Sequence, residues 1–345
     1  MTIEESVPLA TLTTLRVGGP ARYVISIKKP ADLPEAVAFA AERSLPITVL
    51  GGGSNVLAPD AGYAGVVLHM QLPGISFADA GAAVLVTAGA GASWDVLVEK
   101  AVARGLWGIE NLAGIPGTVG AAPVQNIGAY GMELEQVFVS ADVYDRRTGE
   151  VRPYMHNECA FEYRQSRFKS EPELIITSVT LELKKDGSPQ LQYGDLAARA
   201  AVGEPLGTPA AVAAAVRSIR ARKFPDLAVC GTAGSFFKNP IISEEKYTKL
   251  AVRFGDITEI HGAIPRYPLQ REGEVKIPLA YILDKVLGMR GYRIGPVHLF
   301  NAQPLVLVAD EGATQQDIDA LANDVAQKVF EATGIAIERE VRNIA

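Results

Sequence analysis

The sequence predicts an α+β protein built from two or three domains. A chain of 345 residues is too long for one small core, and 48% hydrophobic with 21% charged residues is typical of globular proteins. Near the N-terminus strands alternate with one helix, whereas the middle of the chain is rich in strands and poor in helices. These patterns favour mixed sheets with the helices gathered in particular segments.

The first segment, residues 1–67, is predicted to be a small unit that contains a βαβ motif. Leu33, Val37 and Ala40 have helical spacing, and the flanking stretches are rich in β-branched residues. The expected elements are a strand at 21–28, a helix at 31–46 and strands at 47–50 and 65–70. The second of these strands runs directly into a glycine triplet.

Residues 68–207 are predicted to form a second α+β unit with few helices. Ser93 precedes the helical stretch WDVLVEKAVARG, and a serine side chain at that position caps the free N–H groups of a first turn. The expected strands lie at about 74–78 and 83–88, in a hairpin over 137–154, and at 174–185.

Residues 208–304 are predicted to form a third unit that begins with a helix. Thr208 stands at the N-cap position and Pro209 suits the first helical position. Further helices are expected near 243–254 and 277–287.

The last segment, about 305–345, contains a strand, a long amphipathic helix over 314–334, and a terminal stretch, IAIEREVR. We expect this terminal stretch to be a strand that pairs with an earlier segment. Glu338 and Glu340 are two residues apart, so in a strand both face the same side, which is ordinarily a solvated face.

Composition and charge narrow the possible partners. A net charge of −6 argues against nucleic acid or an anionic membrane surface as a partner, but not against a small anion held by local basic residues. The chain has no apolar run long enough to cross a bilayer and no secretory signal. Cys159 and Cys230 have no metal-ligand spacing and fit reduced thiols. We therefore expect a cytoplasmic protein without a metal.

Two loops are candidates for binding a nucleotide. In GGGSNVL (51–57), glycines directly after a strand allow backbone N–H groups to approach phosphate oxygens. This stretch is neither a Walker A loop nor a Rossmann fingerprint, and a plain turn is the commoner role of a glycine triplet. NLAGIPGTVGAAPVQNIGAYG (111–131) has many small residues and no charge, which fits contact with a flat ligand or a tightly packed connection.

Single polar residues suggest further chemistry. Arg164 follows aromatic residues in FEYRQS, a setting that suits a carboxylate ligand, although most arginines are solvated. Tyr193 lies in YGDL, where core packing is the ordinary role. Ser235, in GTAGSFFKNP, lacks a GxSxG elbow and an evident histidine partner, which argues against a hydrolase. A serine can instead donate a proton when the acceptor carbon is strongly basic.

Seven stretches, in order from residue 51 to residue 342, together resemble the UDP-N-acetylenolpyruvoylglucosamine reductase (UDP-N-acetylmuramate dehydrogenase) family, type I branch, and the likeness starts from TTLRVGG (13–19). They are GGGSNVL, ENLAGIPGTVGAAPVQNIGAYG, FEYRQS, YGDL, RARKFPD, GSFFKNP and EREVR. The resemblance implies two N-terminal α+β domains that bind FAD (1–67 and 68–207), of the PCMH or vanillyl-alcohol-oxidase-like type. It also implies a C-terminal α+β substrate-binding domain (208–304), with 305–345 packed back onto the FAD-binding part.

The resemblance also implies roles for individual residues. The implied catalytic residues are Arg164, Ser235 and Glu340. The implied FAD-binding residues are Gly51, Gly52, Gly53, Ser54, Asn55, Gly114, Pro116, Gly117, Gly120, Ala121, Ala122, Asn126 and Gly128. The implied substrate-binding residues are Tyr193, Arg220, Lys223 and Asn239.

The implied activity is the NADPH-dependent, FAD-mediated reduction of UDP-N-acetylenolpyruvoylglucosamine to UDP-N-acetylmuramate in peptidoglycan precursor synthesis. Hydride is expected to pass from NADPH to N5 of FAD and then to the enolpyruvyl methylene carbon. Arg164 would stabilise the resulting negative charge, and Ser235 would protonate the neighbouring carbon, with Glu340 assisting. The expected partners are the sugar nucleotide and NADPH, and the expected state is a monomer.

Two alternatives are an FAD-linked oxidase on the same fold and a flavin- or nucleotide-binding protein without catalysis. The Ser235 loop argues against the first, and the combination of Arg164, Ser235 and Glu340 argues against the second.

Three stretches depart from the family pattern, and one of them is the first loop, GGGSN, which lacks the acid that a family variant has between the glycines. Ala121 and Ala122 stand where some relatives carry serines. Residues 297–308 align poorly, so the sequence does not decide whether Asn301 or Gln303 supplies an amide to the site.

Overall fold

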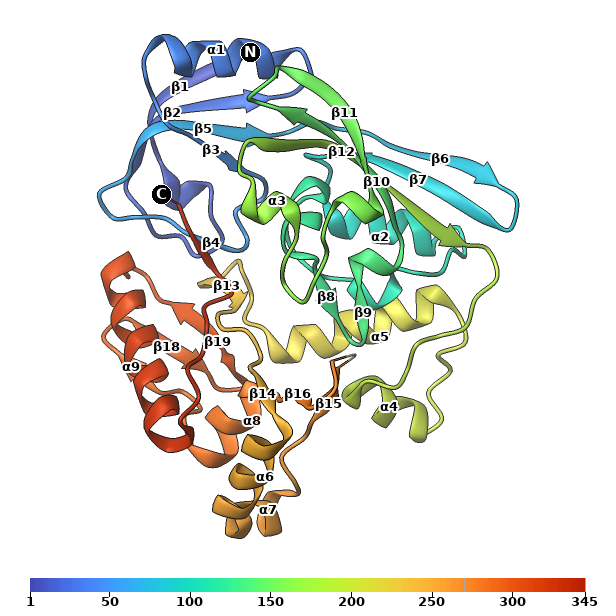
Figure 1. The fold of residues 1–345 in the computed structure, drawn as a ribbon, viewed down its shortest axis with the longest axis vertical. Coiled ribbons are helices and arrows are strands. Elements are labelled where there is room, and N and C mark those ends of the chain that lie inside the picture. The colour runs from blue at the N-terminus through green and yellow to red at the C-terminus, as the bar shows by residue number, and fades with distance from the viewer. Residues whose placement is uncertain (270, 345) are drawn as a thin grey trace.

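The N-terminal unit is a four-stranded sheet with a helix on one face (Figure 1). The computed structural model describes residues 1–269 and 271–344. The strand order is β1 (Thr2–Pro8), β2 (Pro20–Ile27), β5 (Tyr63–Met70) and β3 (Ile47–Leu50). Strands β2, β5 and β3 are parallel, and α1 (Asp32–Glu42) buries Leu33, Ala36 and Ala40 against them. The predicted βαβ arrangement is confirmed.

The second unit is a five-stranded antiparallel sheet. Its order is β11 (Glu150–Met155), β10 (Phe138–Asp145), β12 (Leu174–Lys184), β7 (Ala83–Gly89) and β6 (Ile75–Ala80). The predicted hairpin corresponds to β10 and β11, and the predicted helix to α2 (Trp94–Val102), which Ser93 caps by accepting a hydrogen bond from Val96 N. Shorter elements are β8 (Gly128–Ala129), β9 (Met132–Glu133), α3 (Arg167–Ser170) and α4 (Gly194–Ala201).

Helix α5 (Pro209–Lys223) packs in the core of the second unit, although we expected it to open the third. Val212, Val216 and Ile219 lie in one buried cluster with Trp94 and the inner strands of the five-stranded sheet. Thr208 caps this helix as predicted, since its Oγ1 accepts from Ala211 N at 3.2 Å. The helix was visible in the sequence, but its packing against α2 and the Glu110–Leu112 turn was not.

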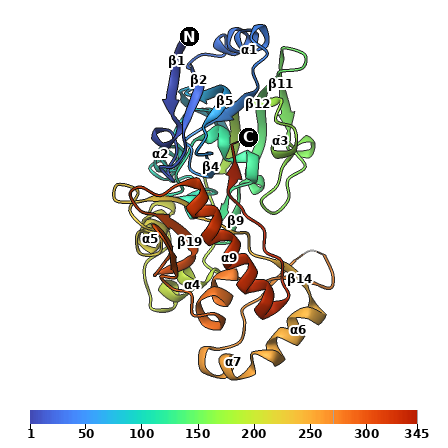
Figure 2. The same cartoon turned by 90° about the vertical axis from the view of Figure 1, so that its left-hand side faces the viewer.

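The third unit is a four-stranded antiparallel sheet backed by a long helix. Its order is β13 (Gly231–Ser235), β19 (Gln303–Ala309), β18 (Val297–Phe300) and β17 (Arg293–Ile294). Helix α9 (Gln315–Thr333) packs here through Ile318, Leu321 and Val325, and Figure 2 shows it lying along this lobe. No helix among the described residues is long and apolar enough to cross a bilayer.

A smaller sheet extends the third unit. It consists of β14 (Ile241–Ser243), β16 (Glu274–Lys276) and β15 (Tyr267–Pro268), with α6 (Glu244–Arg253) and α7 (Gly255–His261) beside it. Helix α8 (Leu279–Tyr281) continues into a π-helical turn over Ile282–Val286.

The C-terminal stretch links the third unit to the first. Glu340 N donates to Phe236 O at 2.8 Å, and Arg342 N donates to Asn55 O at 3.1 Å. Strand β20 (Arg342–Asn343) then pairs in parallel with β4 (Val56–Leu57), so the C-terminus crosses to the other lobe (Figure 1). We expected the whole segment 305–345 to pack back onto the FAD-binding part. Because β19 and α9 lie in the core of the third unit, the part of this segment that pairs with a strand of the first unit is the stretch after α9.

The predicted continuous strand over 335–342 is wrong, and so is the shared orientation of its two glutamates. The stretch is irregular before β20, with one bridge between Phe237 and Arg339. The Glu338 side chain is 74% exposed and pairs with Lys238, whereas the Glu340 side chain is only 11% exposed. Strand periodicity fails here because the backbone is not regularly extended.

Candidate active site

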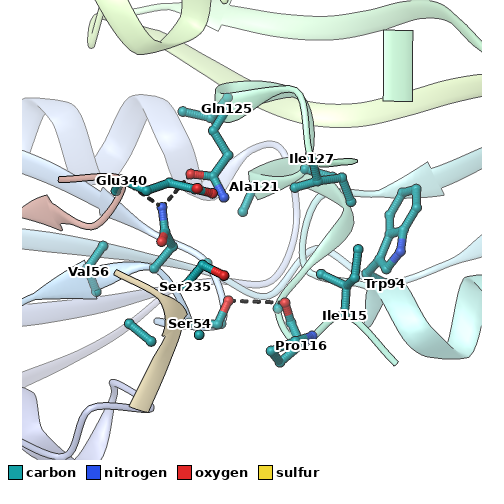
Figure 3. A pocket seen from close by; sticks show the side chains of 18 of the residues that line it. Ser54, Val56, Trp94, Ile115, Pro116, Ala121, Gln125, Ile127, Ser235 and Glu340 are labelled. Atoms are coloured by element: carbon teal, nitrogen blue, oxygen red, sulfur yellow. Dashed lines mark hydrogen bonds between the residues drawn. The ribbon is translucent and has the colours of Figure 1, made fainter. Parts of the chain in front are cut away.

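A cavity of about 1150 Å³ lies where the three units meet. Sites for single small molecules usually measure about 300–1,000 Å³, so this space suits an extended ligand together with a second one. All predicted site residues line it except Asn126. Figure 3 shows Ser235 and Glu340 on one side of the cavity and Trp94 and Ile115 on the other.

The two glycine-rich loops meet at the floor of this cavity. A Cβ on Gly52 would lie 2.8 Å from Gly117 Cα, so only glycine permits this approach. Ser54 Oγ donates to Pro116 O at 3.1 Å and ties the loops together (Figure 3). Gly53 has φ +62°, and a side chain there would overlap Leu12 O. Residues of both loops therefore line the same cavity side by side.

Thr118, which the sequence analysis did not select, supplies a polar group to this floor. Its Oγ1 is buried without a hydrogen-bond partner among the described residues, and it lies beside the position that a Gly51 side chain would fill. Such a group costs free energy unless a ligand satisfies it. The glycine cradle and the unpartnered hydroxyl fit the phosphate or polar ring edge of a cofactor such as FAD.

Asn126 lies behind the cavity wall. It is fully buried with φ +44°, and its side chain binds neighbouring loops: Oδ1 accepts from Glu135 N at 3.0 Å, and Nδ2 donates to Glu162 O at 3.3 Å. Its own carbonyl accepts from Arg164 Nη1 at 3.4 Å. Its side chain thus shapes the loop that holds Arg164.

Arg164 is held by the second glycine-rich loop and by the C-terminal stretch. Its Nη2 donates to Gly128 O at 2.7 Å, and its Nε lies 2.9 Å from Glu340 Oε1. The Nε–carboxylate contact is an ion pair whose angle does not suit a hydrogen bond. Both side chains are largely buried, with exposed fractions of 15% and 11%.

Burial and pairing act in opposite directions on this pair. Burial opposes the charge of Arg164, but the nearby Glu340 raises its pKa, so the guanidinium stays charged. Burial raises the pKa of Glu340, although Arg164 acts to lower it. The site therefore holds a permanent cation beside a carboxyl group that binds a proton more readily than an exposed glutamate.

A bulge at the end of β13 aims Ser235 into the cavity. The pairing with β19 shifts register between Thr232 and Ser235, and Gly234 has φ +76°. Phe236 and Phe237 follow, buried at 1% and 2% exposure, and anchor the strand end in the third core. Glu340 N donates a hydrogen bond to Phe236 O, and Phe236 directly follows Ser235 in the sequence. This backbone contact holds Glu340 near Ser235.

The predicted substrate-side residues come from three different elements. Arg220 in α5 donates from Nε to Gly114 O at 3.0 Å, and its guanidinium lies 4.4 Å from the Phe224 ring centroid. Burial lowers the pKa of Arg220. Lys223 pairs with Asp195.

Tyr193 and Asn239 complete this side. The Tyr193 ring stacks on Tyr267, with centroids 5.8 Å apart. Asn239 Oδ1 accepts from Leu279 N at 3.0 Å, which leaves the amide NH₂ as its unused donor group.

The cavity is positively charged within an acidic chain. Among the described residues that line it, six are arginine or lysine and three are acidic. Arg164, Arg217 and Lys223 have carboxylate partners, whereas Arg146, Arg220 and Arg342 have no ion-pair partner among the residues described. Partly buried cations without counter-charges favour anionic ligands.

Four further polar residues line the cavity and were not predicted from the sequence: Thr118, Arg146, Gln125 and Arg342. The sequence also left the role of Gln303 undecided. Gln303 lines the cavity, but Asn301 does not. Only Arg342 could have been predicted from spacing, because it lies two residues after Glu340 in EREVR. The other residues lie in stretches whose polar side chains have no distinctive spacing.

Comparison with known proteins agrees with this geometry. Residues 21–153 match the family model of an FAD binding domain. Residues 225–344 match that of the UDP-N-acetylenolpyruvoylglucosamine reductase C-terminal domain, which begins just after α5. The fold and the site define an FAD-containing oxidoreductase.

Curated relatives give the family. UDP-N-acetylenolpyruvoylglucosamine reductase of Cupriavidus pinatubonensis is 42% identical, covering 97% of each chain, and that of Pseudomonas aeruginosa is 40% identical, covering 98% of each. The crystal structure of the Thermus caldophilus reductase superposes over 100% of both chains with a TM-score of 0.69 and 25% identity. The chain belongs to the UDP-N-acetylenolpyruvoylglucosamine reductase family, which confirms the predicted fold class.

Proposed function

We propose that this protein reduces UDP-N-acetylenolpyruvoylglucosamine to UDP-N-acetylmuramate, with NADPH as hydride donor and FAD as bound cofactor. The observation that carries the proposal is that Arg164, Ser235 and Glu340 line the same cavity as the two glycine-rich loops. These residues come from three separate segments, and a binding protein without catalysis gives no reason for their convergence.

The cofactor site is proposed at the junction of the two loops. Gly51, Gly52, Gly53 and Gly117 allow a diphosphate to approach the backbone, and Thr118 Oγ1 offers a hydroxyl without a protein partner. Ala121 and Ala122 both line the cavity, and neither offers the hydroxyl that a serine would present to a ligand there. FAD bound there would supply the transfer of hydride from NADPH to the enolpyruvyl methylene carbon.

Arg164 is proposed to stabilise the negative charge that develops next to the reduced carbon. Its guanidinium is held by two carbonyls and by Glu340, so it is oriented before substrate arrives. A fixed charge in a partly desolvated site stabilises developing charge without reorganisation. Glu340 is proposed to orient this guanidinium.

Ser235 is proposed to donate the proton that completes the saturation. Ser235 lines the cavity, and Figure 3 shows its side chain there. A hydroxyl is a weak acid in water, but an enolate-like carbon is basic enough to take its proton.

The diphosphate and sugar of the substrate are proposed to bind on the α5 side. Arg220 lacks an ion-pair partner among the described residues, Lys223 can exchange Asp195 for a phosphate, and Asn239 presents its amide donors. Tyr193 offers a ring already stacked on Tyr267. A cytoplasmic location, a monomeric state and a role in peptidoglycan precursor synthesis belong to the same proposal.

One experiment tests the function. The purified protein is examined for a flavin spectrum, and NADPH oxidation is followed with and without UDP-N-acetylenolpyruvoylglucosamine, under air and under nitrogen. We expect oxidation that depends on the enolpyruvyl substrate and persists without oxygen. Oxidation coupled only to oxygen would indicate the oxidase instead, and a protein that cannot be reconstituted with flavin would overturn the proposal.

A further inference from the structure

Arg164 lies in a backbone conformation that favours glycine. Glu162 and Gln165 close a tight turn around it, with Glu162 N donating to Gln165 O at 3.1 Å and Gln165 N to Glu162 O at 3.0 Å. Arg164 is the second central residue of this turn and has φ +55°. A side chain at such a position strains the backbone unless the surroundings hold it there.

Lys169 provides such a restraint. Its Nζ donates to the carbonyl oxygen of Arg164 at 2.9 Å, the backbone group next to the strained dihedral. A charged donor makes a stronger hydrogen bond than a neutral one, particularly where water is partly excluded. Lys169 therefore contacts the backbone of Arg164, whereas Glu340 contacts its guanidinium.

The helix that carries Lys169 is itself fixed to the second unit. Arg167 N donates to Cys159 O at 2.7 Å, and Ser166 Oγ donates to Val124 O at 2.8 Å. Phe168 is buried in the core of that unit. The donor therefore stands on a rigid support, and the hydrogen bond can fix the direction in which the turn presents its guanidinium.

We propose that Lys169 is a positioning residue, which holds the Arg164 turn in the conformation that directs the guanidinium to Glu340 and into the cavity. The proposal rests on the proposed function. It assigns Lys169 no contact with substrate or cofactor, since Lys169 does not line the cavity.

The test compares Lys169→Met with Lys169→Arg, which retains a donor. Lys238→Met is the matched control: Lys238 lies near the same charges as Lys169, around Glu338 and Glu340, but its Nζ pairs with Glu338 and does not reach Arg164. Flavin reduction by NADPH and flavin reoxidation by the enolpyruvyl substrate are followed separately by stopped flow. Isothermal titration then compares binding of UDP-N-acetylenolpyruvoylglucosamine with that of the same nucleotide sugar without its enolpyruvyl group.

We expect Lys169→Met to slow reoxidation by about tenfold, the scale of one lost charge-assisted hydrogen bond, with reduction by NADPH nearly unchanged. Affinity should fall for the enolpyruvyl compound only, and Lys169→Arg should restore most of the rate. Lys238→Met should behave as wild type.

Wild-type reoxidation rates in Lys169→Met, or equal losses in both half-reactions, would overturn the positioning role. The same holds if Lys238→Met and Lys169→Met are equally slow. If Lys169→Met does not fold, Lys169→Arg alone tests the role. A tenfold loss of its reoxidation rate, despite the retained donor, would also refute the positioning role. A wild-type enzyme whose flavin is not reoxidised by the enolpyruvyl substrate would instead refute the proposed function.

Discussion

Arg164 Nε lies 2.9 Å from Glu340 Oε1, which joins a turn of the second unit to the C-terminal stretch. Two carbonyl oxygens of the second glycine-rich loop accept hydrogen bonds from the other two guanidinium nitrogens. The ion pair therefore connects the proposed cofactor loop with the segment that pairs beside Ser235.

Glu340→Gln should weaken this connection without changing its shape. We expect flavin reoxidation by substrate to slow by about 10- to 100-fold, because a misoriented guanidinium stabilises the developing charge poorly. Burial raises the pKa of Glu340, so the wild-type rate should fall as pH decreases through a value above the usual glutamate range. Pre-steady-state rates measured against pH check both points. A low-pH limb that persists in the glutamine variant would assign the titration to another group.

Ser235→Ala should separate the two half-reactions. Reduction of the flavin by NADPH should remain nearly intact, while reoxidation by substrate should fall by about 10²- to 10⁴-fold, the usual contribution of a general acid. Anaerobic stopped flow measures each step. An equal loss in both steps would contradict a proton-donor role, and bound-flavin content serves as the control for folding.

Thr118→Val should have opposite effects on the free and the flavin-bound protein. Without flavin the change removes a buried, unpartnered hydroxyl, so the unfolding temperature should stay the same or rise. With flavin it removes a ligand hydrogen bond, and Kd for FAD should increase by roughly fivefold to tenfold. Thermal melts and flavin titration give the two values. Unchanged FAD affinity would mean that this hydroxyl does not contact the cofactor.

Gly53→Ala should abolish flavin retention. Its φ of +62° and the adjacent Leu12 carbonyl exclude a side chain, so the loop has to move. Gly149→Ala is the matched control, since Gly149 has φ +76° but open space around it, and it should lose only about 1 kcal/mol of stability. The flavin-to-protein absorbance ratio after purification checks this prediction. Full flavin occupancy in the Gly53 variant would exclude the first loop as the cofactor cradle.

Much of the local structure could be predicted because its causes are local. Helical spacing at Leu33 and Ala40, the cap at Thr208, and the glycine triplet after β3 each act within a few residues. The residues chosen from the motifs also come together, since all of them except Asn126 line one cavity.

Other features depended on contacts between distant segments. The apolar face of α5 could have packed against any apolar surface, and only the structure shows that it packs against α2 and the Glu110–Leu112 turn in the core of the second unit. Glu338 and Glu340 diverge because the stretch before β20 is irregular, so alternation along a strand did not apply. Asn126, chosen from its motif, supports the Arg164 loop from behind the wall.

The sequence alone determined most of the secondary-structure elements of the chain, its family resemblance and the residue types available for chemistry, because these follow from spacing and side-chain identity. Only the tertiary structure decided which charges are neutralised. An arginine is ordinarily solvated, and its pairing with a glutamate far along the chain depends on how three units enclose one cavity. Burial then determines the strength of that pairing, and burial belongs to the folded chain as a whole.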